Sequence, residues 1–297
     1  MLIARLIADS GPNGIALEKR LDAFSAALAG DGMRLAEAQL LDHCGDVLEL
    51  ELPGGDPLRL GALIQQHFVP VDWLVSNDEI RTPQLFVSDM DSTMIGQECI
   101  DELADFAGIK AEIAEITERA MQGELDFEAA LRERVGLLRN LSESAITECL
   151  DTRISPTEGA QVLVETLKHH GCKTVLVTGG FHQFADVVAE QLGFERVVGN
   201  RLGIEGGVLT GGLIGAITDS SVKKAVLIEE AALLGENAIT LATGDGANDI
   251  PMLEAATYGM AYDGKPKARE AANGSIERGD LRAVLKLLGI PERDWVD

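Results

Sequence analysis

The chain has 297 residues, of which 46% are hydrophobic and 25% are charged, so it is long enough for two domains or for one core with a large insertion. Its 49 acidic residues outnumber its 25 basic residues and give a formal net charge of -24, which argues against a nucleic-acid or anionic-membrane partner. An anionic substrate would be repelled at long range, so a site for one needs its own local cations.

The sequence indicates a cytoplasmic protein. No stretch approaches the roughly 20 apolar residues that a membrane span needs. Arg5 and Asp9 interrupt the first apolar run too early for a signal peptide. The four cysteines are scattered without a close pair, which favours reduced, mostly buried thiols.

Residues 1–80 predict a small α+β unit that precedes the main domain. Short β-like runs at 2–8, 34–40, 47–52 and 71–75 alternate with amphipathic helices at about 15–28 and 58–67. This βαββαβ order is typical of a ferredoxin-like fold. The unit contains no catalytic constellation, and a packing or oligomerisation role and a ligand-sensing role both stay open. The polar segment 77–84, which contains Pro83, is the expected linker.

The rest of the chain predicts an α/β domain, a Rossmann-like doubly wound parallel sheet. An apolar strand at 85–88 is followed by a purely helical block to about residue 153, which we expect to form a cap over the strand ends. From residue 155 the pattern alternates between strand and helix. The expected elements are strands at 173–177, 238–242 and 258–262, a hairpin at 202–215 and a last helix at about 281–288.

Polar motifs follow three of these strands. Asp89 and Asp91 come directly after the first, Thr178-Gly179-Gly180 follows the second, and a glycine-rich segment with Asp245 and Asp249 follows the third. The carboxyl ends of parallel strands lie at one edge of the sheet, where open α/β sheets bind their ligands. These motifs therefore predict one site.

The aspartates suit phosphate-ester hydrolysis, a very slow reaction that needs a nucleophile, a proton donor and a cation. Asp89 would be the nucleophile and form an aspartyl-phosphate. Asp91 would act as general acid and then as general base. Asp245 would share Mg²⁺ with Asp89, since Mg²⁺ favours carboxylate and phosphate oxygens. Asp249 could bind the ion directly or through a water molecule.

Positive and hydrogen-bonding groups for the phosphoryl oxygens are also present. Thr178 and the amides of Gly179 and Gly180 would stand at the start of a helix, whose dipole favours an anion. Taken alone, this segment is also compatible with an ordinary strand-to-helix turn. Lys223, on the first turn of a later helix, would supply a fixed positive charge, although its neighbour Lys224 leaves the choice between the two open.

In chain order, Asp-Met-Asp-Ser-Thr at 89–93, Thr-Gly-Gly-Phe at 178–181, a lysine at a helix start and Gly-Asp-Gly-Ala-Asn-Asp at 244–249 resemble the motifs of the haloacid-dehalogenase-type phosphatases. The resemblance covers roughly residues 85–290. Within that family, residues 89–108, 127–135 and 156–159 are most similar to members that hydrolyse O-phospho-L-serine, which gives the last step of serine biosynthesis as the implied activity.

The resemblance implies a role for each matching residue. The implied Mg²⁺ site consists of Asp89, the backbone carbonyl of Asp91, and Asp245. The implied substrate contacts are phosphate contacts from Thr178, Gly179 and Lys223, Asn248 near the substrate, Glu98 on the ammonium, Arg134 on the carboxylate, and Phe127 as a pocket wall. From the residues alone, Arg132 and Arg139 compete with Arg134, and surface roles are open for all three. An arginine suits a carboxylate because it binds it bidentately.

The expected organisation is an ACT-like unit at 1–80 and a phosphatase domain at 81–297 with a helical cap at 98–153. The amino-terminal unit resembles the amino-acid-binding regulatory domains fused to many relatives. Three alternatives remain: a phosphatase or phosphotransferase for another small phosphomonoester, for example with homoserine as acceptor; a receiver-like phosphoacceptor; and a protein that is primarily an amino-acid sensor. The partner is a small molecule, and a homodimer is one option for the oligomeric state.

Overall fold

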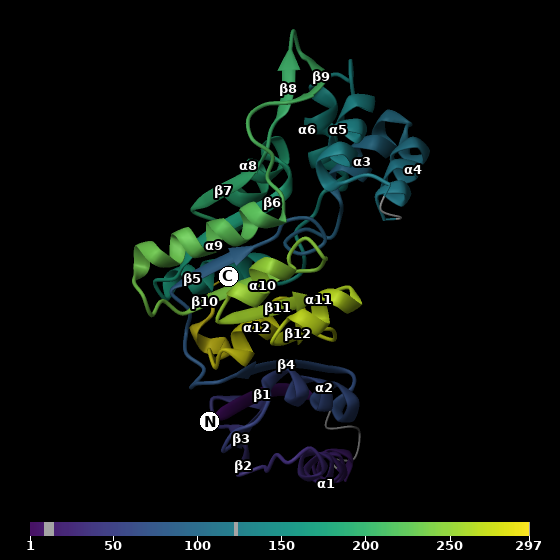
Figure 1. The fold of residues 1–297 in the computed structure, drawn as a ribbon. Helices are drawn as coiled ribbons and strands as arrows, with labels where there is room; N and C mark the ends of the chain where they lie inside the picture. The colour runs from purple at the N-terminus through teal and green to yellow at the C-terminus, as the bar shows by residue number, and fades with distance from the viewer. Residues whose placement is uncertain (9–14, 122–123, 297) are drawn as a thin grey trace.

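The structure is a computed structural model and describes residues 1–8, 15–121 and 124–296. The molecule is elongated, with residues 1–76 at one end, residues 98–153 at the other, and an α/β core between them (Figure 1). This arrangement places the strand ends of the core opposite the inserted helices.

The core contains a parallel sheet in the order β12-β11-β10-β5-β6-β7. Both faces of this sheet are buried: Phe86 of β5 packs in one apolar cluster and Val87 in another. Burial on both faces explains why these strands are nearly continuous apolar runs in the sequence. The strands are β5 (Leu85–Ser88), β6 (Lys173–Phe181), β7 (Arg196–Asn200), β10 (Thr240–Gly244), β11 (Tyr258–Tyr262) and β12 (Gly274–Ile276).

Helices cover both faces of this sheet, which confirms the expected doubly wound α/β fold. One cluster includes α7 (Ala160–His169), α8 (His182–Leu192) and α12 (Arg282–Leu287). The other includes α9 (Ser220–Leu234), α10 (Ile250–Ala255) and α11 (Pro266–Ala271). A short 3₁₀ helix, Glu292–Asp294, follows α12.

The amino-terminal unit has the expected βαββαβ order. Its antiparallel sheet has the strand order β2-β3-β1-β4, and Phe24 of α1 and Leu63 of α2 pack together with one face of that sheet. The elements are β1 (Leu2–Ala8), α1 (Ile15–Gly30), β2 (Glu37–Leu41), β3 (Cys44–Leu52), α2 (Pro57–Phe68) and β4 (Val71–Ser76). The role of this unit as an amino-acid-binding domain stays a prediction.

The two sheets are continuous, which the sequence did not indicate. β4 pairs antiparallel with β12, so one ten-stranded sheet runs through the molecule. The buried Asp72 carboxylate of β4 accepts hydrogen bonds from the backbone N–H groups of Glu277 and Arg278, both at 2.8 Å. Arg5 donates to the carbonyl of Leu287 at 3.1 Å. The expected division at residue 80 therefore stays a prediction, since hydrogen bonds cross it.

The insertion after β5 forms the expected helical cap. It contains α3 (Cys99–Ala107), α4 (Lys110–Met121), α5 (Phe127–Leu137) and α6 (Ser144–Arg153). The expected hairpin is present as β8 (Leu202–Glu205) and β9 (Val208–Leu213), and it lies beside α5 and α6 (Figure 1). Backbone bonds of 2.8 Å join Leu209 of the hairpin to Asn140 and Leu141 of the cap. The hairpin is thus a second connection between core and cap.

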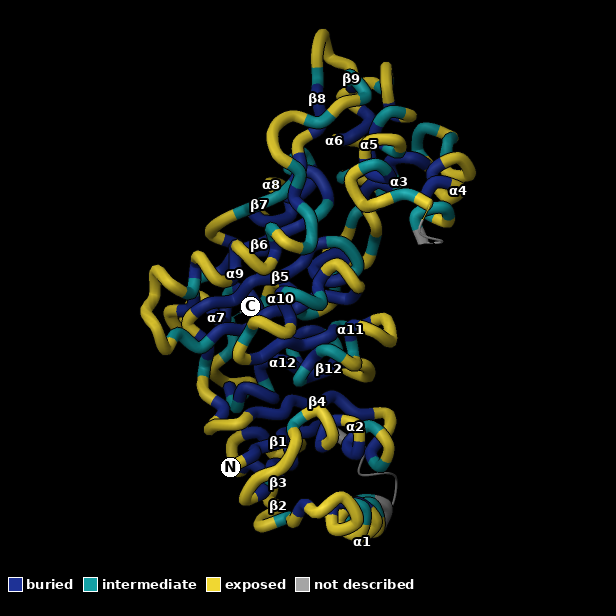
Figure 2. The backbone as a smooth tube through the Cα atoms, viewed as in Figure 1, coloured by how far each residue is buried: buried dark blue, intermediate teal, exposed yellow. Residues whose placement is uncertain are grey.

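Burial is uneven along the chain. The central core strands β5 and β10 are buried, whereas the tip of the β8–β9 hairpin is exposed (Figure 2). All four cysteines are buried free thiols, as expected. Among the described residues, no helix is both long enough and apolar enough to cross a membrane.

Candidate active site

Asp89 stands directly after β5 and is 3% exposed. Its backbone N–H donates to the carbonyl of Thr243 at 2.9 Å, which holds it beside the end of β10. Its carboxylate accepts a hydrogen bond from the N–H of Met90 at 2.7 Å. Burial, with a smaller contribution from Asp249, holds the pKa of Asp89 well above its usual range.

Lys223 bridges two carboxylates beneath the site. Its ammonium lies 2.7 Å from Asp89 Oδ1 and 2.7 Å from Asp249 Oδ1, and its side chain is 1% exposed. Burial acts to lower the pKa of Lys223, but the two carboxylates outweigh burial and raise it. Asp219 fixes the start of α9 by accepting N–H bonds from the first turn. Lys224 is exposed, so the structure places Lys223 rather than its neighbour at Asp89.

The segment after β10 folds tightly around Asp249. Its Oδ2 accepts N–H bonds from Asp245 at 3.1 Å and Gly246 at 3.0 Å. A Cβ at Gly244 would lie 2.4 Å from the Asp249 carboxyl carbon, so this carboxyl fits only because position 244 is a glycine. Asp249 is therefore locked in place, with both of its oxygens already accepting hydrogen bonds.

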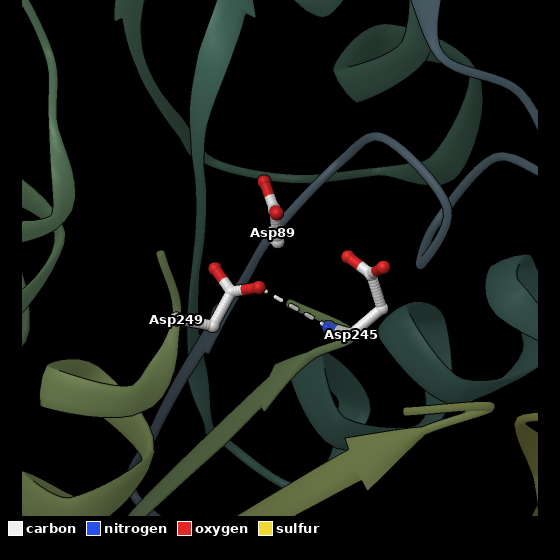
Figure 3. A group of neighbouring side chains, drawn as sticks. All are labelled: Asp89, Asp245 and Asp249. Atoms are coloured by element: carbon white, nitrogen blue, oxygen red, sulfur yellow. Dashed lines mark hydrogen bonds between the residues drawn. The ribbon is translucent and has the colours of Figure 1, made fainter. Parts of the chain in front are cut away.

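Asp89, Asp245 and Asp249 form a buried acidic cluster. Each offers a carboxylate oxygen within 4.8 Å of the others, and Figure 3 shows the carboxylates gathered between the end of β5 and the segment after β10. Burial raises the pKa of Asp245 as well, although the ammonium of Lys265 opposes it. Hard carboxylate oxygens at this spacing fit a divalent cation, and the two ammonium groups of Lys223 and Lys265 face three acids. The cluster can therefore hold a metal ion.

Asp91 lies beside this cluster in a different environment. It is half-buried, and its Oδ1 accepts the N–H of Cys99 at 3.3 Å. Burial and the nearby Glu98 raise the pKa of Asp91 to about 7. A Cβ at Gly180 would lie 2.9 Å from Asp91 Oδ2, so this carboxylate approaches the backbone of β6 closely. A carboxyl group with this pKa can donate a proton near neutral pH.

A cavity of about 230 Å³ separates the core from the cap. The cap residues predicted to bind substrate line it, together with most of the predicted core residues, whereas Lys223 and Asp249 lie beneath it. The lining residues are Asp89, Asp91, Glu98, Ile100, Phe127, Leu131, Arg134, Thr178, Gly179, Gly180, Phe181, Asp245, Asn248 and Lys265.

On the cap side, the cavity has one anionic and one cationic residue. Glu98 accepts a hydrogen bond from the Ser92 hydroxyl at 2.8 Å. Arg134 is half-buried, and within the described part of the chain no carboxylate forms an ion pair with it. Arg132 is exposed and pairs with Glu128 at 2.8 Å, and Arg139 is also exposed. The structure thus places Arg134 alone of these three arginines in the cavity.

The Thr-Gly-Gly segment lies on the core side, but not where a helix begins. β6 extends through residues 178–181, and α8 starts only at His182. The expectation of a helix start at Thr178 was wrong, because these residues continue the strand. The Thr178 hydroxyl accepts the N–H of Gly180 at 2.8 Å, and an ideal Cβ at Gly179 would lie 3.5 Å from the ring of Phe127. Cap and core are thus nearly in contact at this edge.

Sequence reasoning missed Lys265. Its ammonium lies 2.9 Å from Asp245 Oδ2, and the residue lines the cavity. Burial acts to lower the pKa of Lys265, but Asp245, with smaller contributions from Glu98 and Asp249, outweighs burial and raises it. The available signal was its position three residues after β11, at the same sheet edge as the three motifs.

Comparison with known proteins identifies the family. The family model described as haloacid dehalogenase-like hydrolase matches residues 86–254. The chain belongs to the haloacid dehalogenase-like hydrolases. It is 44% identical, over 210 residues, to a phosphoserine phosphatase from Albidiferax ferrireducens, which covers 69% of this chain and 89% of the relative. The resemblance found in the motifs is confirmed, and the protein is a phosphatase.

Solved structures of this family are also similar. A HAD family hydrolase from Salmonella enterica serovar Typhi matches 97% of this chain and 99% of its own, with a TM-score of 0.82 and 27% identity. A structure titled as a phospho-aspartyl intermediate analogue of phosphoserine phosphatase matches 69% of this chain and 99% of its own, with a TM-score of 0.63 and 39% identity. The first of these likenesses extends over the amino-terminal unit.

Proposed function

We propose that this protein hydrolyses O-phospho-L-serine to L-serine and phosphate through an aspartyl-phosphate at Asp89. One observation carries the proposal. The cavity joins a core side lined by Asp89, Thr178 and the two glycines 179 and 180 to a cap side that presents Glu98 and Arg134. O-phospho-L-serine has a phosphoryl group at one end, and an ammonium and a carboxylate at the other. The named relatives support the same activity.

In the first step, a carboxylate oxygen of Asp89 attacks phosphorus and the bond to the serine oxygen breaks. Asp91 donates its proton to that leaving oxygen, which its pKa of about 7 favours. The ammonium of Lys223, 2.7 Å from Asp89, opposes the effect of burial on the pKa of Asp89. It therefore favours the ionised nucleophile, and it offsets the charge of the phosphoryl group.

In the second step, water attacks the aspartyl-phosphate. Asp91, now a carboxylate, takes a proton from that water, phosphate leaves and Asp89 is restored. Thr178 and the backbone of Gly179 and Gly180 line the cavity where the phosphoryl oxygens would lie. Closure of the cap over the substrate would limit access of bulk water to the intermediate.

We propose Mg²⁺ as the cation, with Asp89, Asp245 and the backbone carbonyl of Asp91 as its protein ligands. When bound, Mg²⁺ neutralises charge on the phosphoryl oxygens and so favours attack by a carboxylate. Asp249 would act through a water molecule, since its oxygens already accept bonds from Lys223 and two backbone amides. Asp249 also fixes Lys223, a role that does not depend on the ion.

On the cap side, the Arg134 guanidinium would bind the substrate carboxylate and Glu98 the ammonium. Phe127, 40% exposed and close to Gly179, would close the cavity over the bound molecule, and Asn248 would contact it from the core. We also propose a cytoplasmic location, supported by the four buried free thiols. A homodimer and an amino-acid-binding role of the amino-terminal unit stay proposals.

The test is phosphate release from O-phospho-L-serine with and without Mg²⁺, beside phosphohomoserine, phosphoglycolate and p-nitrophenyl phosphate. We expect Mg²⁺-dependent turnover with the highest kcat/KM for O-phospho-L-serine. A preference for another ester would retain the Asp89 chemistry but overturn the assignment of Glu98 and Arg134. One stoichiometric phosphorylation without further turnover would indicate a receiver-like phosphoacceptor instead.

A further inference from the structure

A buried asparagine outside the predicted site holds two of its loops together. Asn200 is the last residue of β7 and is 2% exposed. Its Nδ2 donates to the carbonyl of Gly179 at 2.8 Å and to that of Thr218 at 3.3 Å. Its Oδ1 accepts the N–H of Thr218 at 2.9 Å. All three bonds reach backbone groups, so the contact sets main-chain positions.

The two backbone segments carry different parts of the phosphoryl site. The carbonyl of Gly179 belongs to the same peptide group as the N–H of Gly180, and both glycines line the cavity. Thr218 immediately precedes Asp219, the N-cap of α9, whose first turn carries Lys223. Asn200 therefore connects the Gly179–Gly180 peptide to the helix that brings Lys223 to Asp89.

This segment needs such a support for two reasons. Two successive glycines have unusual backbone freedom, and fixing them in one orientation costs entropy. In addition, the pairing of β6 with β7 shifts register between Val177 and Phe181, so the regular ladder is interrupted there. A buried side chain with matched donors and acceptors replaces the missing ladder bonds.

Asn200 also closes the base of the hairpin that contacts the cap. The chain leaves Asn200 into β8 and returns from β9 to Thr218, while Leu209 near the tip bonds to Asn140 and Leu141 of the cap. The hydrogen bonds of Asn200 thus join the base of the hairpin to Gly179 and to the residue before the N-cap of α9.

We propose that Asn200 is a positioning residue for the phosphoryl subsite: it fixes the Gly179–Gly180 peptide relative to the Lys223 helix without touching substrate. The inference rests on the proposed function only for the location of the phosphoryl group. It predicts that losing the Asn200 donor weakens phosphate binding and leaves the cap side unaffected.

The test compares two matched variants. Asn200→Asp keeps the acceptor but removes both donor bonds and turns a carboxylate toward two carbonyl oxygens. Gln183→Glu likewise keeps the acceptor and removes a donor bond, because the Gln183 amide donates to the carbonyl of Leu202 at 2.9 Å and accepts from its N–H at 3.2 Å. Of these two side chains, only that of Asn200 bonds to Gly179. Calorimetry with Mg²⁺ present would measure the Kd of inorganic phosphate and, separately, of L-serine.

We expect Asn200→Asp to raise the phosphate Kd about tenfold with an unchanged L-serine Kd, and Gln183→Glu to match the wild type for both. An unchanged phosphate Kd in Asn200→Asp would overturn the inference. Equal losses in both variants, or equal losses for phosphate and L-serine, would do the same, because they indicate general destabilisation. Asn200→Ser, neutral and smaller, replaces Asn200→Asp if the latter fails to fold by its melting curve.

The phosphate measurement does not depend on the identity of the ester. If the wild type binds phosphate but does not hydrolyse O-phospho-L-serine, the proposed function fails, and the comparison of the phosphate constants still tests Asn200. If the wild type binds no phosphate in the presence of Mg²⁺, the subsite itself is wrong and both proposals are overturned.

Discussion

Replacing Lys223 with methionine is expected to destabilise the fold, and Mg²⁺ should restore part of the loss. Lys223 is a buried cation between Asp89 and Asp249. The side chain of Lys223 is 1% exposed, that of Asp89 4% and that of Asp249 0%. Methionine keeps most of the apolar stem but removes the charge. The two carboxylates are then left facing each other without a cation between them.

Removing one partner of a buried ion pair costs about 3–5 kcal/mol. Here one ammonium serves two acids, so we expect Lys223→Met to lie in that range without metal. A divalent cation bound by the same carboxylates stabilises the folded state by mass action. Because the variant site is more negative, Mg²⁺ should raise the free energy of unfolding more in Lys223→Met than in the wild type.

Urea unfolding at pH 7.5, with EDTA or with Mg²⁺, measures both effects. Lys224→Met is the matched control, because Lys224 is the adjacent residue on the same helix and is exposed; it should change stability by less than about 0.5 kcal/mol. The reasoning is refuted if the two variants lose equal stability, or if Mg²⁺ does not reduce the deficit of Lys223→Met.

Three further predictions concern the cap, the metal site and the joined sheet. Arg134→Ala should raise the KM for O-phospho-L-serine about 30-fold, because a charge-assisted hydrogen bond is lost. Turnover of p-nitrophenyl phosphate by this variant, and both activities of the control Arg132→Ala, should stay near those of the wild type. Equal effects of Arg134→Ala on both esters would contradict this role. Lys265→Gln removes a cation 2.9 Å from Asp245, so the Mg²⁺ concentration that gives half-maximal activity should be lower than in the wild type. A higher Mg²⁺ requirement would contradict this and show that Lys265 supports the metal site. Burial raises the pKa of Asp72, so the folded state binds the proton of Asp72 more tightly than the unfolded state does. The stability of the wild type relative to Asp72→Asn should therefore fall as pH rises above about 4. If the two proteins differ in urea unfolding by an amount that is constant with pH, the raised pKa is contradicted.

The sequence was most informative where the chemistry follows strands. Asp89, Thr178 and Asp245 each come directly after or within an apolar run, and parallel strands bring their carboxyl ends to one edge. That rule, with the family motifs, was enough to predict residues that the structure places around one cavity.

The missed features depend on contacts between distant segments. Asn200 acts through the backbone of residues 179 and 218, which leaves no local pattern in the sequence. The pairing of β4 with β12 involves a strand of only three residues, too short for a periodic signal. The expected helix start at Thr178 is replaced by a strand that continues to Phe181. Glycine has a low strand propensity, and tertiary contacts override it here.

The central claim is that Asp89 attacks phosphorus before water does. The most direct measurement is the stereochemical course of hydrolysis, in ¹⁷O-labelled water, of the phosphorothioate analogue of O-phospho-L-serine made chiral at phosphorus with ¹⁸O. The thiophosphate released then carries sulfur and three different oxygen isotopes, so its configuration can be read. Two successive in-line displacements, first by Asp89 and then by water, predict net retention of configuration at phosphorus. Net inversion would show a single direct attack by water and would contradict the role of Asp89 as nucleophile.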